Sequence, residues 1–131
     1  MAVAAARDCL RGMDKLTVDA LYLCSTTLPF SDRLNAGIVK TALNLKDNLV
    51  ATDLTSCLRA GTSGLIAALS AVGQGNTRNA LVVASDKRET KAAYFYEMWF
   101  GDGAASLMVG ETYVIAACKC WHSVTHDFVD H

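Results

Sequence analysis

The amino-acid sequence predicts an α/β fold in which helices cover both faces of a mostly parallel sheet. Short apolar segments alternate with helical segments along the chain, and the run A-L-V-V-A at residues 80–84 is apolar throughout. Unbroken apolar runs of this kind are typical of strands that are buried on both faces. Strands that alternate with helices of ten or more residues are joined by right-handed crossovers and therefore lie parallel.

The first half of the chain predicts a helix, a strand and a second helix. Residues 1–12 form the first helix, because Val3, Ala6 and Leu10 share one side and Gly12 can end it. Residues 20–24 form an apolar strand between polar neighbours. A helix over residues 34–45 follows, with Ser31 and Asp32 as its expected caps. Its apolar positions recur at helical spacing and are Leu34, Ile38, Ala42 and Leu45.

The second half predicts a strand, a helix and three further strands. Residues 49–54 form the first of these strands, and a helix follows that Gly73 and Gly75 can end. The apolar face expected for this helix consists of Leu58, Leu65, Leu69 and Val72. Residues 79–86 form the next strand, and residues 104–109 and 114–118 are expected to pair as a hairpin. No repeat or linker divides the chain, so residues 1–131 are interpreted as one domain.

Composition excludes several classes of function. The chain has 12 Lys and Arg against 13 Asp and Glu, without the basic patch that nucleic-acid binding needs. Its apolar runs are far shorter than the roughly 20 residues that span a bilayer, and the N-terminus does not resemble a secretion signal. The five cysteines have no disulfide-framework spacing. We therefore expect a cytoplasmic protein with reduced thiols and neither a nucleic-acid nor a membrane partner.

Cys57 is the candidate nucleophile. It lies between the strand at residues 49–54 and a helix rich in glycine, alanine and serine, in the stretch D-L-T-S-C-L-R-A-G-T-S-G. The positive end of a helix favours the thiolate form of cysteine, which is the form that attacks acyl groups. Gly61 and Gly64 each cost the helix about 1 kcal/mol relative to alanine, but they leave it thin enough for close approach of another backbone or a ligand. The alternative is a small apolar side chain in a packed core.

Three segments of the chain carry a family resemblance, namely D-L-T-S-C-L-R-A-G-T-S-G-L-I-A-A-L, N-A-L-V-V-A-S-D and F-G-D-G-A-A-S-L-M-V-G. Together they resemble the thiolase superfamily, in particular its hydroxymethylglutaryl-CoA synthase and β-ketoacyl carrier-protein synthase III branch. The resemblance implies a duplicated αβαβα sandwich in which each half has a mixed five-stranded sheet. This chain resembles the N-terminal half only, so we expect a half-domain that is truncated at both ends, before Met1 and after the ending H-D-F-V-D-H.

The resemblance also implies an activity and its residues. Cys57 would take an acyl group from acyl-CoA or an acyl-carrier thioester and pass it to a carbon nucleophile, with its own N–H as one oxyanion donor. No cofactor is implied, and acyl-CoA is the substrate. The catalytic His and its partner would lie in the second half. Further substrate-binding positions are Thr26, Trp99, Gly101, Asp102 and Gly103.

Thr26 departs from the pattern of hydroxymethylglutaryl-CoA synthases, which carry a glutamate in this loop as the base for the incoming acetyl group. A threonine cannot act as a carboxylate base. The sequence therefore favours acyl transfer of the thiolase or ketoacyl-synthase kind over hydroxymethylglutaryl formation.

Three other groups of residues have open interpretations. The segment C-K-C-W-H-S-V-T-H could hold zinc through Cys118, Cys120, His122 and His126, although its spacing is unlike known zinc motifs, and no metal site is predicted. The aromatic residues at 94–100 could line an acyl tunnel, a subunit interface or plain core. Lys87, Arg88 and Lys91 could meet CoA phosphates or form a solvated charge run.

Two classes of function therefore remain. One is an acyl-transfer enzyme, or part of one, and the other is a non-catalytic remnant or assembly subunit with the same fold. In either class a half-sandwich leaves apolar surface uncovered, so we expect a homo-oligomer or a companion chain that supplies the second half.

Overall fold

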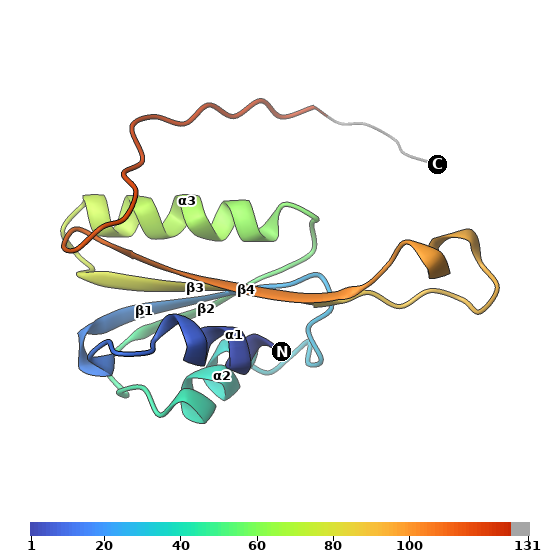
Figure 1. The fold of residues 1–131 in the computed structure, drawn as a ribbon, viewed down its shortest axis with the longest axis horizontal. Coiled ribbons are helices and arrows are strands. Elements are labelled where there is room, and N and C mark those ends of the chain that lie inside the picture. Colours follow the sequence, from blue (N-terminus) through green and yellow to red (C-terminus); the bar gives the residue numbers. More distant parts are fainter. Residues whose placement is uncertain (127–131) are drawn as a thin grey trace.

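The computed structural model describes residues 1–126, which form a four-stranded sheet between two helical layers (Figure 1). In chain order the main elements are α1 (Ala2–Cys9), β1 (Val18–Cys24), α2 (Asn35–Leu43), β2 (Val50–Leu54), α3 (Ala60–Gly73), β3 (Asn79–Lys87) and β4 (Asp102–Gly110). Two short 3-10 helices, η1 (Lys15–Thr17) and η2 (Phe95–Met98), lie in the connections. The predicted helices and strands up to residue 87 are confirmed, with ends that differ by a few residues.

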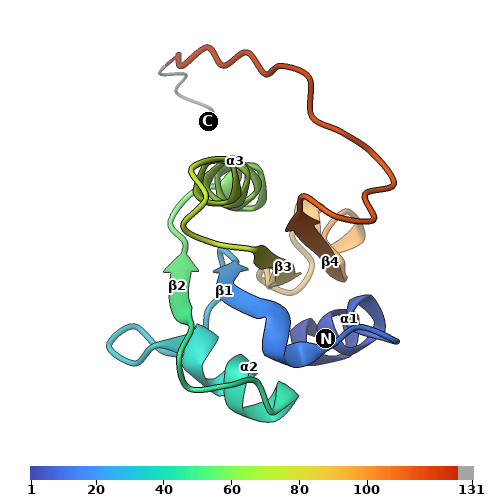
Figure 2. The same ribbon diagram turned by 90° about the vertical axis from the view of Figure 1, so that its left-hand side faces the viewer.

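The sheet is mixed, as predicted, and its strand order is β2-β1-β3-β4. β1 is parallel to both β2 and β3, whereas β4 runs antiparallel to β3. Helix α3 covers one face of the sheet, and α1 and α2 cover the other (Figures 1 and 2). The three parallel strands therefore end at the same edge, where the loops that follow them meet.

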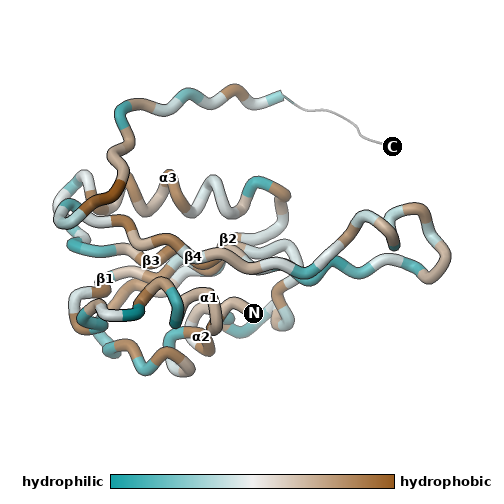
Figure 3. The backbone as a smooth tube through the Cα atoms, viewed as in Figure 1, coloured by the Kyte–Doolittle hydropathy of each residue, from teal (hydrophilic) through white to brown (hydrophobic). Residues whose placement is uncertain are grey.

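Alternating side chains of the strands divide the core into two clusters. Leu21, Leu23, Leu81 and Val83 pack with α1 and α2, whereas Ala20, Cys24, Ala80 and Val82 pack with α3. Hydrophobic stretches follow the strands, and hydrophilic stretches gather in the loops (Figure 3). Val18 shares the cluster of Leu21 because the pairing of β1 with β3 shifts register between Val18 and Ala20.

The predicted hairpin at residues 104–118 is wrong. β4 pairs with β3 along its whole length, and residues 111–126 contain no strand. Val114 and Ile115 are exposed, and this segment passes over the α3 side of the sheet (Figure 1). Pairing with the long β3 offers β4 nine partners, more than a hairpin with residues 114–118 could give. Residues 127–131, which include most of the ending H-D-F-V-D-H, lie outside the described residues.

Two other predictions about helices need correction. Leu58 lies before α3 and is exposed, and the buried face of α3 consists of small residues and one valine, namely Ala60, Gly64, Ala68 and Val72. Leu65 and Leu69 only flank that face. Small side chains occupy this face because they let the helix approach the sheet closely.

None of the helices among residues 1–126 is long and apolar enough to cross a membrane.

The start of α2 is also capped differently from the prediction. Ser31 and Asp32 hydrogen-bond to each other instead. The carboxylate of Asp53, which reaches across from β2, accepts the N–H groups of Asn35 and Ala36, each at 2.7 Å. The first turn of α2 is therefore capped by a side chain that is distant in the sequence, and not by the local residues that were predicted to cap it.

Candidate functional site

Three loops meet at the edge of the sheet where the parallel strands end. They follow β1 (residues 25–34), β2 (residues 55–59) and β3 (residues 88–101), and Figure 1 shows them at the right-hand end of the molecule. We call residues 88–101 the arm, since they project beyond the sheet before β4 returns. In open α/β sheets, ligands bind at this edge because the following helices direct free N–H groups toward it.

Cys57 lies in the turn between β2 and α3, as predicted, and its side chain is exposed. Ser56, directly before it, has the left-handed backbone angle φ 71°, which is uncommon for a residue with a side chain. The carbonyl of Cys57 accepts the N–H of Ala60 at 3.1 Å, which fixes the turn against the first residue of α3. Within residues 1–126 the N–H of Cys57 donates no hydrogen bond, so it is available to a ligand oxygen.

Asp86, near the end of β3, organises the loop after β1. Its Oδ1 accepts hydrogen bonds from the Thr26 N–H at 2.6 Å, the Ser25 hydroxyl at 2.9 Å and the hydroxyls of Thr26 and Thr27 at 3.0 and 3.1 Å. Partial burial raises the pKa of Asp86, but these donors outweigh burial and lower it overall. The carboxylate is thus ionised and engaged as an acceptor, and it fixes the position of Thr26.

The start of β4 adjoins this cluster through the sheet register. Gly103 pairs with Asp86, and Asp102 pairs with Lys87. The segment G-D-G-A at residues 101–104 therefore leads into β4 next to the loop of Thr26. Gly101, Asp102 and Gly103 are exposed.

An open cleft of about 400 Å³ joins the loop of Cys57 to the loop of Thr26. Its lining residues are Thr26, Thr27, Ser56, Cys57, Leu58, Arg88 and Glu89. The structure thus brings together two of the predicted site residues, Cys57 and Thr26. Trp99, Gly101, Asp102 and Gly103 do not line this cleft. Thr27, Ser56 and Glu89 were not among the predicted site residues, although each follows the end of a predicted parallel strand.

The aromatic residues of the arm pack on one another, and none of them lines the Cys57 cleft. Trp99 contacts Phe95, with ring centroids 5.3 Å apart, and remains 72% exposed. Phe100 stacks on Tyr96 at 5.1 Å. Exposed aromatic residues on a projecting segment are typical of an interface.

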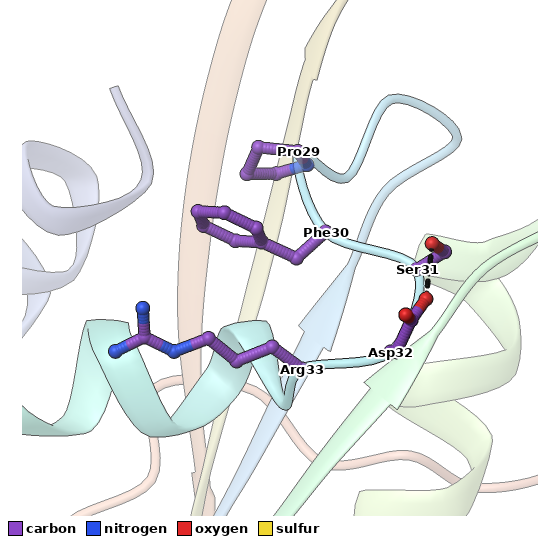
Figure 4. Close-up of a pocket in the computed structure, with 5 residues that line it drawn as sticks. All are labelled: Pro29, Phe30, Ser31, Asp32 and Arg33. Atoms are coloured by element: carbon purple, nitrogen blue, oxygen red, sulfur yellow. Dashed lines mark hydrogen bonds between the residues drawn. The ribbon is translucent and has the colours of Figure 1, made fainter.

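A second hollow, of about 250 Å³, lies on the loop before α2 (Figure 4). It is lined only by the consecutive residues 29–33, and the guanidinium of Arg33 lies 5.4 Å from the ring centroid of Phe30. No residue of the Cys57 cleft lines this hollow. This hollow contains none of the predicted site residues, so we do not interpret it as part of the candidate site.

The other cysteines differ from Cys57 in their surroundings. Cys24 is buried beneath α3, and burial raises the pKa of its thiol to about 11, so it is the least reactive type of thiol at neutral pH. Cys9 is half-buried, whereas Cys118 and Cys120 are exposed in the C-terminal segment, which is not the strand that was predicted there. No group of three or more His, Cys, Asp or Glu side chains within residues 1–126 is arranged to hold a metal ion.

No protein-family model matches the chain. It is 30% identical over 132 aligned positions to the hydroxymethylglutaryl-CoA synthase of Pyrobaculum aerophilum, and the match covers 99% of this chain and 38% of that protein. The chain thus spans well under half the length of this curated relative.

Solved structures show the same relationship. The structure of MvaS in complex with 3-hydroxy-3-methylglutaryl coenzyme A has a TM-score of 0.80 and 27% identity, over 84% of this chain and 27% of that one. The priming β-ketosynthase from the R1128 polyketide biosynthetic pathway has a TM-score of 0.78 and 28% identity, over 87% of this chain and 35% of that one. The chain therefore has a thiolase-like fold and is similar to the N-terminal half of hydroxymethylglutaryl-CoA synthases and of a priming β-ketosynthase.

Proposed function

We propose that this chain carries the nucleophilic half of a condensing acyltransferase, in which Cys57 forms a thioester with the acyl group of acyl-CoA or of an acyl-carrier thioester. The observation that carries the proposal is the placement of Cys57. It is exposed in a strand-to-helix turn, its N–H is available, and it shares a cleft with Thr26 at the edge where ligands bind in such sheets. The relatives support this class of reaction, since they are hydroxymethylglutaryl-CoA synthases and a β-ketosynthase.

The proposed step is an exchange of thioesters. The Cys57 thiolate attacks the acyl carbonyl carbon, and the carbon–sulfur bond to the carrier breaks. The carrier thiolate leaves and takes up a proton. The N–H of Cys57 would stabilise the oxyanion that forms in between, as a preorganised donor that needs no rearrangement. The step needs no cofactor.

The second step, transfer of the acyl group to a carbon nucleophile, needs a general base. None of the residues that line the cleft is a histidine. Thr26 holds a hydroxyl there, bound to Asp86, and Asp86 is itself occupied by four donors. We therefore propose that the chain alone acylates slowly and condenses nothing, and that the complete site transfers acyl groups in the manner of thiolases or ketoacyl synthases. For this step Trp99, Gly101, Asp102 and Gly103 remain proposed substrate-binding residues.

We further propose that a second copy or a companion chain completes the site. The residues of β4 from Asp102 to Ala105 are exposed, and no strand among residues 1–126 pairs with the outer side of β4. An open edge strand is a ready template for another strand. The arm, which carries several exposed aromatic residues, runs directly into β4 (Figure 1). These features also suit the second candidate function, a non-catalytic assembly subunit, which differs from the first in needing no reactive Cys57.

All five cysteines are free, which suits a cytoplasmic location.

Acylation of the intact chain tests the proposal. After incubation with acetyl-CoA, peptide mass spectrometry should find acetyl on Cys57 ahead of the other four thiols, and Cys57→Ser should remove this label. Exposed Cys118 and Cys120 are internal controls for access alone. Equal labelling of Cys57, Cys118 and Cys120, or no label on Cys57, would reject the acyl-transfer function and leave the assembly role.

A further inference from the structure

Arg88 is the cationic side chain in the wall of the Cys57 cleft. It lies at the base of the arm and lines the cleft together with Cys57 and Thr26. Its guanidinium carbon lies 4.1 Å from the centroid of the Phe100 ring, at the other end of the arm. A guanidinium held on the face of an aromatic ring keeps its N–H groups free, because stacking uses its face and not its edge.

The ring beneath Arg88 is itself supported. Phe100 stacks on Tyr96 with an interplanar angle of 6°, and the Phe100 N–H donates to the Tyr96 carbonyl at 2.9 Å. Arg88 and Tyr96 thus both contact the Phe100 ring, so that this ring joins the start of the arm to its end. This support reduces the number of positions that the guanidinium can take, so less conformational freedom is lost when it binds a ligand.

The charges around Arg88 leave its own charge unmatched. Its neighbour Glu89 also lines the cleft, but the Glu89 carboxylate pairs with Lys87, at 3.3 Å. Among residues 1–126, Arg88 has no carboxylate within salt-bridge distance. Arg78 shows the contrast, since the carboxylate of Asp19 accepts two of its side-chain N–H groups.

We propose that Arg88 binds an anionic group of the thioester ligand in the Cys57 cleft. The group is either a carboxylate at the far end of the acyl chain or a phosphate of the carrier, since both match the paired N–H groups of a guanidinium. This inference deepens the proposed function by naming a ligand group. Its test uses alkylation and does not depend on acyl transfer, so the two ideas can fail separately.

Two alkylating reagents of similar size, one anionic and one neutral, measure the effect. Iodoacetate carries a carboxylate and iodoacetamide is neutral, and with either reagent the Cys57 thiolate displaces iodide to form a thioether. The ratio of the two rates at Cys57, read by peptide mass spectrometry, should fall roughly fivefold in Arg88→Gln, the order expected for two unit charges in contact near water. In about 1 M salt the ratio of the unsubstituted chain should fall as well, because ions screen the attraction.

Matched variants separate a binding site from a general charge effect. Lys91→Gln removes one positive charge from the same arm but not from the cleft, so its ratio should stay within twofold of the original. Arg88→Lys keeps the charge and should retain most of the ratio. Circular dichroism shows whether Arg88→Gln is folded. If it is not, Arg88→Lys still tests the role of the charge at this position. An unchanged ratio in a folded Arg88→Gln, or an equal loss in Lys91→Gln, would overturn the proposal.

Protection experiments identify the anion. Neutral iodoacetamide reports occupancy of the cleft, with 4′-phosphopantetheine as the phosphate probe and glutarate as the carboxylate probe. Arg88-dependent protection of Cys57 by the first assigns a carrier phosphate, and by the second an acyl carboxylate. If neither slows alkylation at millimolar concentration, Arg88 does not bind an anion there and the proposal is rejected.

Discussion

At Gly64 the helix α3 packs closely on the sheet. A Cβ atom added at this position would overlap the Sγ of Cys24 and would lie 3.3 Å from Cδ1 of Leu54. The sulfur of Cys24 therefore occupies the space that a side chain on the helix would need. This close approach gives a structural reason for a glycine that costs the helix about 1 kcal/mol in propensity.

We predict that Gly64→Ala lowers the free energy of unfolding by about 1–3 kcal/mol, the usual cost of overpacking a core. Denaturation by urea measures it. Combining Gly64→Ala with Cys24→Ala should cost less than the sum of the two single changes, because removing the sulfur makes room for the new methyl group. Strict additivity would show that the overlap is relieved in another way.

Gly61 provides the matched control on the same helix. A Cβ there would meet only the Cβ of Ala84, at an ordinary contact distance of 3.5 Å. Gly61→Ala should therefore be neutral or stabilise the fold by up to about 1 kcal/mol through helix propensity. A loss as large as that of Gly64→Ala would show that α3 tolerates no added bulk on either residue.

At the scale of single elements, the start of α2 depends on β2. Both carboxylate oxygens of Asp53 accept backbone N–H groups of the first helical turn. The Asn35 side chain, which is buried, donates to Asp53 and to the Phe30 carbonyl. The loop after β1, the first turn of α2 and the strand β2 are thereby joined, and this loop leads to the wall of the Cys57 cleft.

We predict that Asp53→Ala lowers the free energy of unfolding by about 1–2 kcal/mol, the cost of losing a helix cap. Asp32→Ala is the control, since Asp32 is exposed and its one hydrogen bond within residues 1–126 is to its neighbour Ser31. It should change stability by less than about 0.5 kcal/mol, as most surface substitutions do. A larger loss of stability in Asp32→Ala than in Asp53→Ala would show that Asp32 caps α2, as the sequence predicted.

At the scale of the whole molecule, one carboxylate joins the loops at each edge of the sheet. Asp19, at the amino ends of the strands, has its pKa lowered first by hydrogen bonds from Arg78 and then by Lys46. Asp86, at the carboxyl ends, has its pKa raised by burial and lowered further by the donors of residues 25–27. Both pKa values fall below the ordinary 3.8 of an aspartate.

These shifts predict how stability depends on pH. A carboxyl group whose pKa is lower in the folded state stabilises the fold above its ordinary pKa, and this contribution is lost as the pH falls. The urea midpoint should therefore decrease as the pH falls below about 4. At neutral pH, Asp19→Asn and Asp86→Asn should each have a lower urea midpoint than the unsubstituted chain. Their midpoints should also decrease less as the pH falls. Asp47→Asn should follow the unsubstituted chain, because the Asp47 side chain is fully exposed and solvent weakens its ion pair with Lys40.

The sequence alone determined the elements whose signal is local. β1 and β3 each contain an apolar run between polar residues, and α3 ends at Gly73 as expected. The alternation of these strands with helices determined the parallel arrangement, because the handedness of such crossovers is nearly invariant. The motifs around Cys57, Asp86 and Gly103 predicted the thiolase-like fold through their family resemblance. Helix and strand propensities alone do not distinguish this fold from other α/β folds.

Only the tertiary structure decided features that depend on residues far apart in the chain. Asp53 caps α2 in place of Ser31 and Asp32, the sulfur of Cys24 fills the space next to Gly64, and β4 pairs with β3 instead of with residues 114–118. The same holds for the cleft, where Arg88 joins Cys57 because their two strands end at one edge. Hydrogen bonds and close packing act over a few ångströms in space, so a pattern along the chain does not reveal which distant residue supplies the partner.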